Sequence, residues 1–124
     1  MVYKCGLVLL IGPAALAVLI FEITLNASAI FNHANLKLPL SVDRILRPFI
    51  VTPDMHRVHH SVIEGETNSN YGFNFSIWDR LCRTYKAQPE AGHDGMTIGL
   101  SEHQTEQPAE LFWSLKLPFA KSLK

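Results

Sequence analysis

The first part of the chain is almost unbroken apolar sequence. Residues 5–21 contain no charged side chain, and residues 23–25 continue the apolar run beyond Glu22. At a rise of about 1.5 Å per residue, the uncharged stretch would cover about 25 Å, slightly less than the roughly 30 Å hydrocarbon core of a bilayer. Lys4 could extend its amine to the interface. The pattern therefore predicts a membrane helix over about residues 5–25.

Two other interpretations of this run stay open. It could be a buried helix of a soluble protein or a signal peptide. Against a signal peptide, Lys4 is the only charged residue before the run, and no distinct small-residue cleavage site follows it. Pro13 lies within the run and would bend or break a helix there, while neighbouring helices could satisfy the freed carbonyl.

The remaining chain alternates short apolar and polar stretches that suit helices. Residues 26–36 should begin as helix and end before Pro39, and residues 40–50 have the mixed pattern of an amphipathic segment lying on a surface. Residues 64–70 are typical of a loop, and residues 71–85 of a short helix or packed turn. The pattern predicts an all-α fold of membrane-associated helices.

Composition narrows the function classes. The 124 residues carry 11 Lys and Arg against 11 Asp and Glu, and no basic stripe indicates a nucleic-acid partner. Cys5 and Cys82 have no metal-site or disulfide spacing, so we expect free thiols. A catalytic centre together with a membrane region would normally need more residues, so the chain is expected to be an incomplete domain.

Three histidines in the middle of the chain have the spacing of metal ligands. Thr52 can cap a helix whose first residue is Pro53, which places His56, His59 and His60 on one face of its opening turns. Neutral imidazole nitrogens favour iron, copper, zinc or nickel over magnesium or calcium. By itself the pattern could equally be a solvated helix face, a structural zinc site or a coincidence.

The order of the surrounding motifs favours a metal centre. Phe31-Asn32-His33-Ala34-Asn35 precedes the box His56-Arg57-Val58-His59-His60-Ser61, and the box is followed by Glu66-Thr67-Asn68-Ser69-Asn70-Tyr71-Gly72, Ser76-Ile77-Trp78-Asp79-Arg80-Leu81 and Thr84-Tyr85. Over residues 31–85, with a looser match over 111–119, this succession resembles the C-terminal part of the fatty acid hydroxylase and sterol desaturase superfamily. These are integral-membrane, histidine-box di-iron enzymes.

The resemblance implies a site and a cofactor. Two irons would be held by histidines from three boxes, of which this chain has the last, His56, His59 and His60, together with His33 as a further ligand. The two earlier boxes are absent from the sequence. Four imidazoles cannot complete the shells of two metals, so the chain is expected to be a C-terminal fragment that is inactive by itself.

The resemblance also implies the reaction and its partners. The complete enzyme would hydroxylate or desaturate a lipid or sterol-like substrate with dioxygen and a separate electron donor. The histidine region, residues 31–85, would face the cytosol and be followed by a tail, residues 86–124. A non-catalytic membrane protein or metal-binding remnant of the same fold stays open as the alternative.

Other polar residues could support the metal ligands. The resemblance favours Glu66 and Asn70 as side chains that accept an imidazole N–H and so orient the ring, although Asn70 could simply shape a turn. Asp79 could do the same or pair with Arg80 or Arg83. His93 and His103 belong to no spaced pattern, so we expect them to be surface histidines outside the site.

Overall fold

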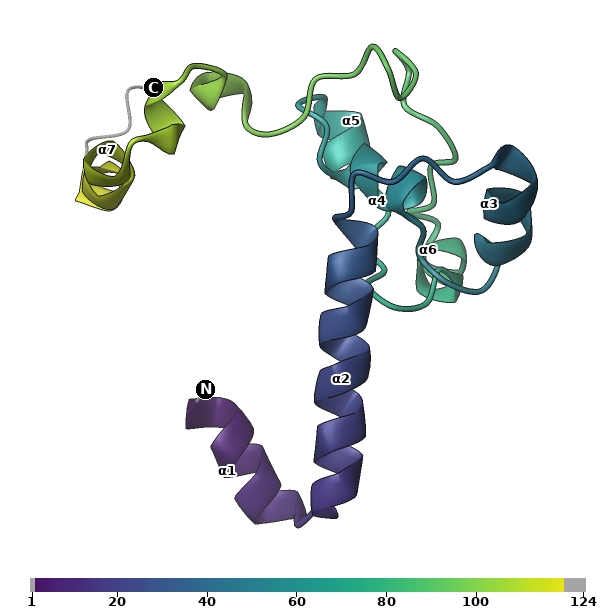
Figure 1. The fold of residues 1–124 in the computed structure, drawn as a ribbon, viewed down its shortest axis with the longest axis vertical. Helices are drawn as coiled ribbons and strands as arrows, with labels where there is room; N and C mark the ends of the chain where they lie inside the picture. Colours follow the sequence, from purple (N-terminus) through teal and green to yellow (C-terminus); the bar gives the residue numbers. More distant parts are fainter. Residues whose placement is uncertain (1, 120–124) are drawn as a thin grey trace.

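The computed structural model describes residues 2–119, and this part of the chain confirms the all-α prediction. Its extended pairings are the isolated bridges Ile50–Phe75 and Ser61–Ile98, and no strand occurs among the described residues. Figure 1 shows α1 and α2 as a V, with the long α2 leading into a body formed by α3 to α6 and with α7 lying apart from it. The helices are α1 Val2–Ile11, α2 Ala15–Asn32, α3 Leu40–Leu46, α4 Pro53–His59, α5 Glu64–Thr67, α6 Ile77–Cys82 and α7 Leu111–Lys116.

The apolar N-terminal run forms two helices and not the single helix expected over residues 5–25. The helix α1 ends at Ile11, where Gly12 adopts a left-handed φ of 63° and its N–H reaches the Val8 carbonyl at 2.9 Å. Pro13 follows and cannot continue the hydrogen-bond ladder. A Lys4–Glu22 ion pair of 2.7 Å then joins α1 to α2.

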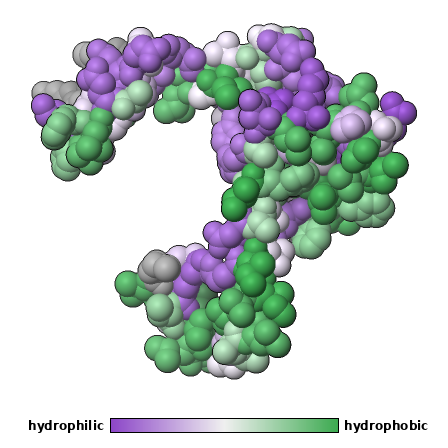
Figure 2. Space-filling model, viewed as in Figure 1, coloured by the Kyte–Doolittle hydropathy of each residue, from purple (hydrophilic) through white to green (hydrophobic). Residues whose placement is uncertain are grey.

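The helix α2 is long and apolar enough to cross a membrane, by length and composition. Only 6% of it is buried within the protein, whereas the core helix of a soluble protein would be largely covered. Figure 2 shows hydrophobic side chains gathered over α1 and the adjoining part of α2. This exposed apolar surface ends near Asn32, where α2 meets the body and packs against α4.

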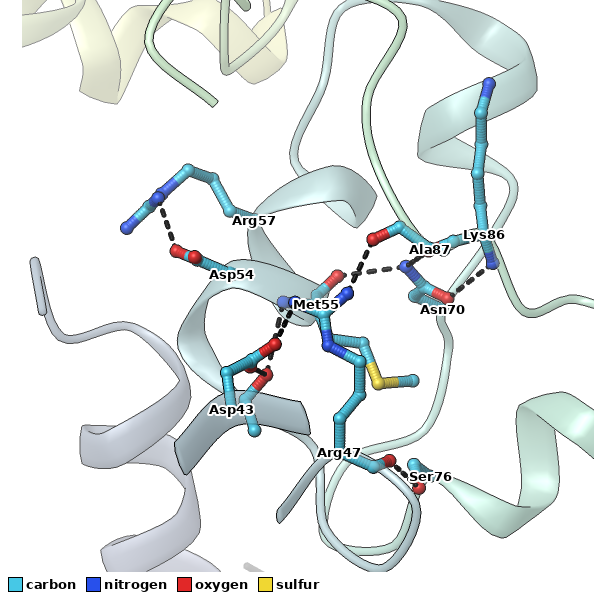
Figure 3. Close-up of polar contacts among 10 residues, drawn as sticks. Asp43, Arg47, Asp54, Met55, Arg57, Asn70, Ser76, Lys86 and Ala87 are labelled. Atoms are coloured by element: carbon cyan, nitrogen blue, oxygen red, sulfur yellow. Dashed lines mark hydrogen bonds and ion pairs between the residues drawn. The ribbon is translucent and has the colours of Figure 1, made fainter. Parts of the chain in front are cut away.

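The body is held together mainly by buried polar contacts, which Figure 3 shows around α4. Asp43 of α3 pairs with Arg47 at 2.7 Å and accepts a hydrogen bond from Thr52 at 2.6 Å, which ties α3 to the start of α4. Arg47 donates to the Ala87 carbonyl, and Ser76 donates to the Arg47 carbonyl, both at 2.6 Å. Because these groups are buried, each needs its partner, and the contacts fix α3, α4 and residues 76–87 relative to one another.

One detail of the body differs from the sequence-based expectation, and two others agree with it. Residues 64–70 are not wholly loop, because Glu64–Thr67 forms one helical turn, α5. In residues 71–85, the predicted short helix is present as α6 and ends at Arg83 with a left-handed φ of 60°. Both expected free thiols, Cys5 and Cys82, are unpaired and exposed.

Candidate metal centre

The local sequence sets where the histidine helix begins. Thr52 has an extended backbone, its hydroxyl oxygen accepts the Met55 N–H at 3.4 Å, and Pro53 occupies the first turn of α4, as predicted. The buried Thr52–Asp43 hydrogen bond holds the cap in place. His56 and His59 consequently lie within α4 and His60 caps its C-terminus, and this helix packs against α2.

Three of the four predicted ligands converge. The Nε2 atoms of His56 and His60 lie 3.1 Å apart, and Nε2 of His33 lies 3.2 Å from the first and 3.3 Å from the second. His56 and His60 are one helical turn apart, whereas His33 comes from the end of α2. His56 is buried, and His33 and His60 are exposed.

Hydrogen bonding fixes the tautomer of His33. Its Nδ1 lies 2.8 Å from the Ala29 carbonyl, which can only accept, so Nδ1 carries the proton. The Nε2 lone pair therefore points toward the other two rings. A backbone carbonyl that orients an imidazole in this way is the usual arrangement behind a metal ligand.

The surroundings keep the imidazole rings of His56 and His60 neutral. Burial is the main cause that lowers the pKa of His56 to about 4, and the neighbouring histidines add to the shift. The pKa of His60 is lowered as well, first by burial and then by the charges of His59 and His33. At neutral pH both rings are unprotonated and can offer a lone pair to a metal.

The donor set fits a first-row transition metal. A hydrogen bond between two neutral imidazole nitrogens needs one donor and one acceptor, so at most two of the three Nε2 contacts can be hydrogen bonds. A metal cation would remove this shortage of donors, because all three nitrogens could then offer it a lone pair. The Nε2 separations of 3.1–3.3 Å are compatible with three imidazoles that bind one such ion.

His59 lies beside the cluster, and its ligating nitrogens are not part of it. Its ring centroid is 5.6 Å from that of His56 and 5.4 Å from that of His60, and it also packs edge-on against Tyr71. Its Nδ1 lies 3.0 Å from the Ser69 carbonyl, so the ring is oriented by the backbone like that of His33. A ligand role for His59 stays a prediction.

The side chains of Glu66 and Asn70 bond elsewhere than to an imidazole. Asn70 donates to the carbonyls of Met55 and Lys86 at 2.9 and 2.8 Å and accepts the Lys86 N–H at 2.9 Å. Glu66 accepts the Glu90 N–H at 2.6 Å and lies 3.5 Å from the Lys86 amine. Backbone carbonyls orient His33 and His59 instead, and Nδ1 of His56 is buried without a hydrogen-bond partner.

Burial alone would raise the pKa of the fully buried Glu66 carboxyl group. The nearby Ser61 hydroxyl, the hydrogen bond from the Glu90 amide and the charge of Lys86 outweigh it, and the pKa is lowered. The carboxylate is thus held ionised, and it fastens the chain at residues 86–90 to α5.

Asp79, His93 and His103 are three further residues for which the sequence predicted a role. Asp79 is buried and accepts hydrogen bonds from the Gly72 N–H at 2.9 Å and the Thr84 hydroxyl at 2.7 Å. It therefore bonds these groups and does not pair with Arg80 or Arg83 as one prediction had it. His93 is not a surface histidine, because both its ring nitrogens are buried without a hydrogen-bond partner. His103 is half-buried and packs edge-on against Trp113.

A cavity of about 500 Å³ opens beside the cluster. His33 and His60 form part of its wall, and the other lining residues are Asn32, Ala34, Asn35, Pro53, Arg57, Ile98 and Gly99. Its volume lies in the range of small-molecule sites. A second cavity, between α1 and α2, is lined by residues of those two helices and by Pro13 of the turn between them, and by none of the histidines.

Comparison with known proteins agrees with this arrangement. The family model described as fatty acid hydroxylase matches residues 1–84, which include all four predicted ligands. Over 38 residues the chain is 50% identical to the ornithine lipid hydroxylase OlsE of Rhizobium tropici, a match that covers 31% of this chain and 12% of that protein. No solved structure matches the chain. With more than half of its length matched by the family model, the chain belongs to the fatty acid hydroxylase family.

Proposed function

We propose that this chain carries part of the metal centre of an iron-dependent lipid hydroxylase. The observation that carries the proposal is the approach of three imidazole Nε2 atoms to within 3.1–3.3 Å of one another. Family membership and the partial match to an ornithine lipid hydroxylase support iron as the metal and a lipid as the substrate. The chain spans 12% of that relative, so we propose that the activity requires further residues in addition to those of this chain.

His33, His56 and His60 would hold one iron ion, and His59 would contribute to a second. Bound iron would supply the activation of dioxygen that attack on an unreactive carbon–hydrogen bond requires. The protein keeps His56 neutral through burial, and it directs the Nε2 lone pair of His33 through the Ala29 carbonyl. A di-iron site would take its remaining ligands from residues outside this chain.

Hydroxylation is favoured over desaturation because the family description and the matched relative both refer to hydroxylases. The notion of a sterol-like substrate has no such support and stays a prediction, as does a separate electron donor. A lipid chain reaching the site would come alongside α2, whose exposed apolar surface ends at the histidine cluster.

We also propose that α1 and α2 are embedded in the membrane and that the histidine region faces the cytosol. The two native cysteines allow a direct test, since Cys5 lies in α1 and Cys82 in α6. In vesicles with the cytosolic face outward, a membrane-impermeant maleimide should label Cys82 rapidly, and Cys5 only after detergent is added. Equal labelling of both cysteines without detergent would contradict the embedding, and labelling of Cys82 only in vesicles of the opposite orientation would reverse the proposed topology.

The proposed reaction is tested by isotope labelling in the cells that carry this sequence. Under ¹⁸O₂, extracted lipids should gain one labelled oxygen atom, and His56→Ala should abolish the labelled product because it removes the buried ligand. His103→Ala is the matched control, because it removes a histidine that lies outside the cluster. Unlabelled lipids from cells whose protein binds metal normally would favour the alternative of a non-catalytic metal-binding protein.

A further inference from the structure

The chain beyond the family match is bonded to the histidine box. Residues 86–99, here called the strap, follow the matched residues 1–84 and are fixed to the body at their first end. Asn70 bonds both the N–H and the carbonyl of Lys86, and the Glu66 carboxylate accepts the Glu90 N–H. Asn70 and Glu66 are fully buried, so this attachment is part of the core.

The other end of the strap is bonded to the histidine box itself. Gly99 donates its N–H to the His60 carbonyl at 2.8 Å, Val62 donates to the Thr97 carbonyl at 3.1 Å, and Ser61 and Ile98 form an antiparallel bridge. Gly99 has a φ of 104°, a conformation that favours glycine. The side-chain amide of Gln104 donates hydrogen bonds to the carbonyls of Ile98 and Leu100, at 3.1 and 2.9 Å.

This attachment brings Ile98 to the wall of the cavity that contains His33 and His60. Ile98 is the largest purely apolar side chain in that wall, and it is 54% exposed, so an incoming molecule can contact it. The cavity also includes Asn32, the last residue of α2. An alkyl chain that follows α2 would therefore enter the cavity between the histidines and the strap.

We propose that Ile98 is a specificity-determining residue, which limits the width of the alkyl group that can approach the metal held by His33, His56 and His60. The inference rests on the proposed function, because it needs a metal in the cluster. A side chain in van der Waals reach of the ligand discriminates by shape, and one or two methylene groups in such a pocket change affinity by about 10–100-fold.

The test uses cobalt(II), whose visible spectrum reports both its own binding and that of an added ligand. The full chain in detergent is loaded with cobalt and titrated with azide, a small ligand, and with 1-butylimidazole, which adds an alkyl chain to the donor. Ile98→Ala should bind 1-butylimidazole about 10-fold more tightly, and Ile98→Trp about 10-fold more weakly. Azide affinity should change by less than about 2-fold in both variants, because azide carries no alkyl chain.

Leu100→Ala is the matched control. Leu100 lies one residue beyond the strap and is similarly exposed, but it does not line the cavity, so this variant should match the wild type. Cobalt affinity measured first in every variant shows that the cluster is intact. The role of Ile98 would be overturned if both Ile98 variants bound cobalt normally and kept the wild-type affinity for 1-butylimidazole. It would also be overturned if Leu100→Ala changed that affinity as much as the Ile98 variants do. Either result would leave the metal centre unaffected. Failure of the wild type to bind cobalt would overturn both.

Discussion

Replacing His56 by alanine is expected to lower the affinity of the chain for cobalt(II) or iron(II) by at least about 100-fold. His56 is the buried member of the cluster, and its Nε2 lies within 3.2 Å of the other two. Loss of a residue that only orients a ligand already costs about 10–100-fold in metal affinity, and loss of the ligand itself should cost more. Metal titration of the purified chain in detergent, with a competing chelator, measures the change.

The control for this experiment is His103→Ala. It also removes one imidazole, but from a ring that packs against Trp113 away from the cluster, so the metal affinity should stay within about 2-fold of the wild type. An equal loss of affinity in both variants would mean that the metal binds adventitiously to histidines in general. Unchanged affinity in His56→Ala would remove His56 from the ligand set.

Asn70→Ala should produce the largest loss of stability among single substitutions in the body. Asn70 is fully buried, and its side chain satisfies the Met55 carbonyl and both backbone groups of Lys86. The substitution leaves these groups without their partner and places alanine at a φ of 48°, which together should lower the free energy of unfolding by about 3–5 kcal/mol.

Chemical denaturation followed by tryptophan fluorescence measures this loss, with Asn68→Ala as the control. Asn68 is exposed, and among the described residues its side chain bonds only the Tyr71 hydroxyl, so its loss should cost less than about 0.5 kcal/mol. A comparable cost for the two variants would show that the link from α4 to the strap contributes little to the fold.

The local parts of the metal centre could be predicted from the sequence. Thr52 and Pro53 start α4, and the spacing of His56 and His60 places their rings one turn apart, both of which follow from helix geometry. The approach of His33 depends on how α2 packs against α4, which no local pattern encodes. The resemblance to a known family, and not the spacing, indicated His33.

The remaining differences depend on tertiary contacts. Glu66 and Asn70 carry the right chemistry to orient an imidazole, but the strap places the backbone of Lys86 and Glu90 closer to them. The burial of the ring nitrogens of His93 likewise follows from the folding of a segment that has no periodicity of its own. Pro13 did indicate a break in the apolar run, yet the full division into α1 and α2 also required the left-handed turn at Gly12.

We expect the imidazoles of His33, His56 and His60 to bind a single metal ion together. X-ray absorption spectroscopy of the cobalt-loaded chain tests it most directly, because multiple scattering from imidazole rings counts the histidine ligands. We expect about three imidazole nitrogens at about 2.1 Å from the metal, and one fewer in His33→Ala. A first shell made only of oxygen atoms, or one that is the same in the wild type and in His33→Ala, would contradict the account.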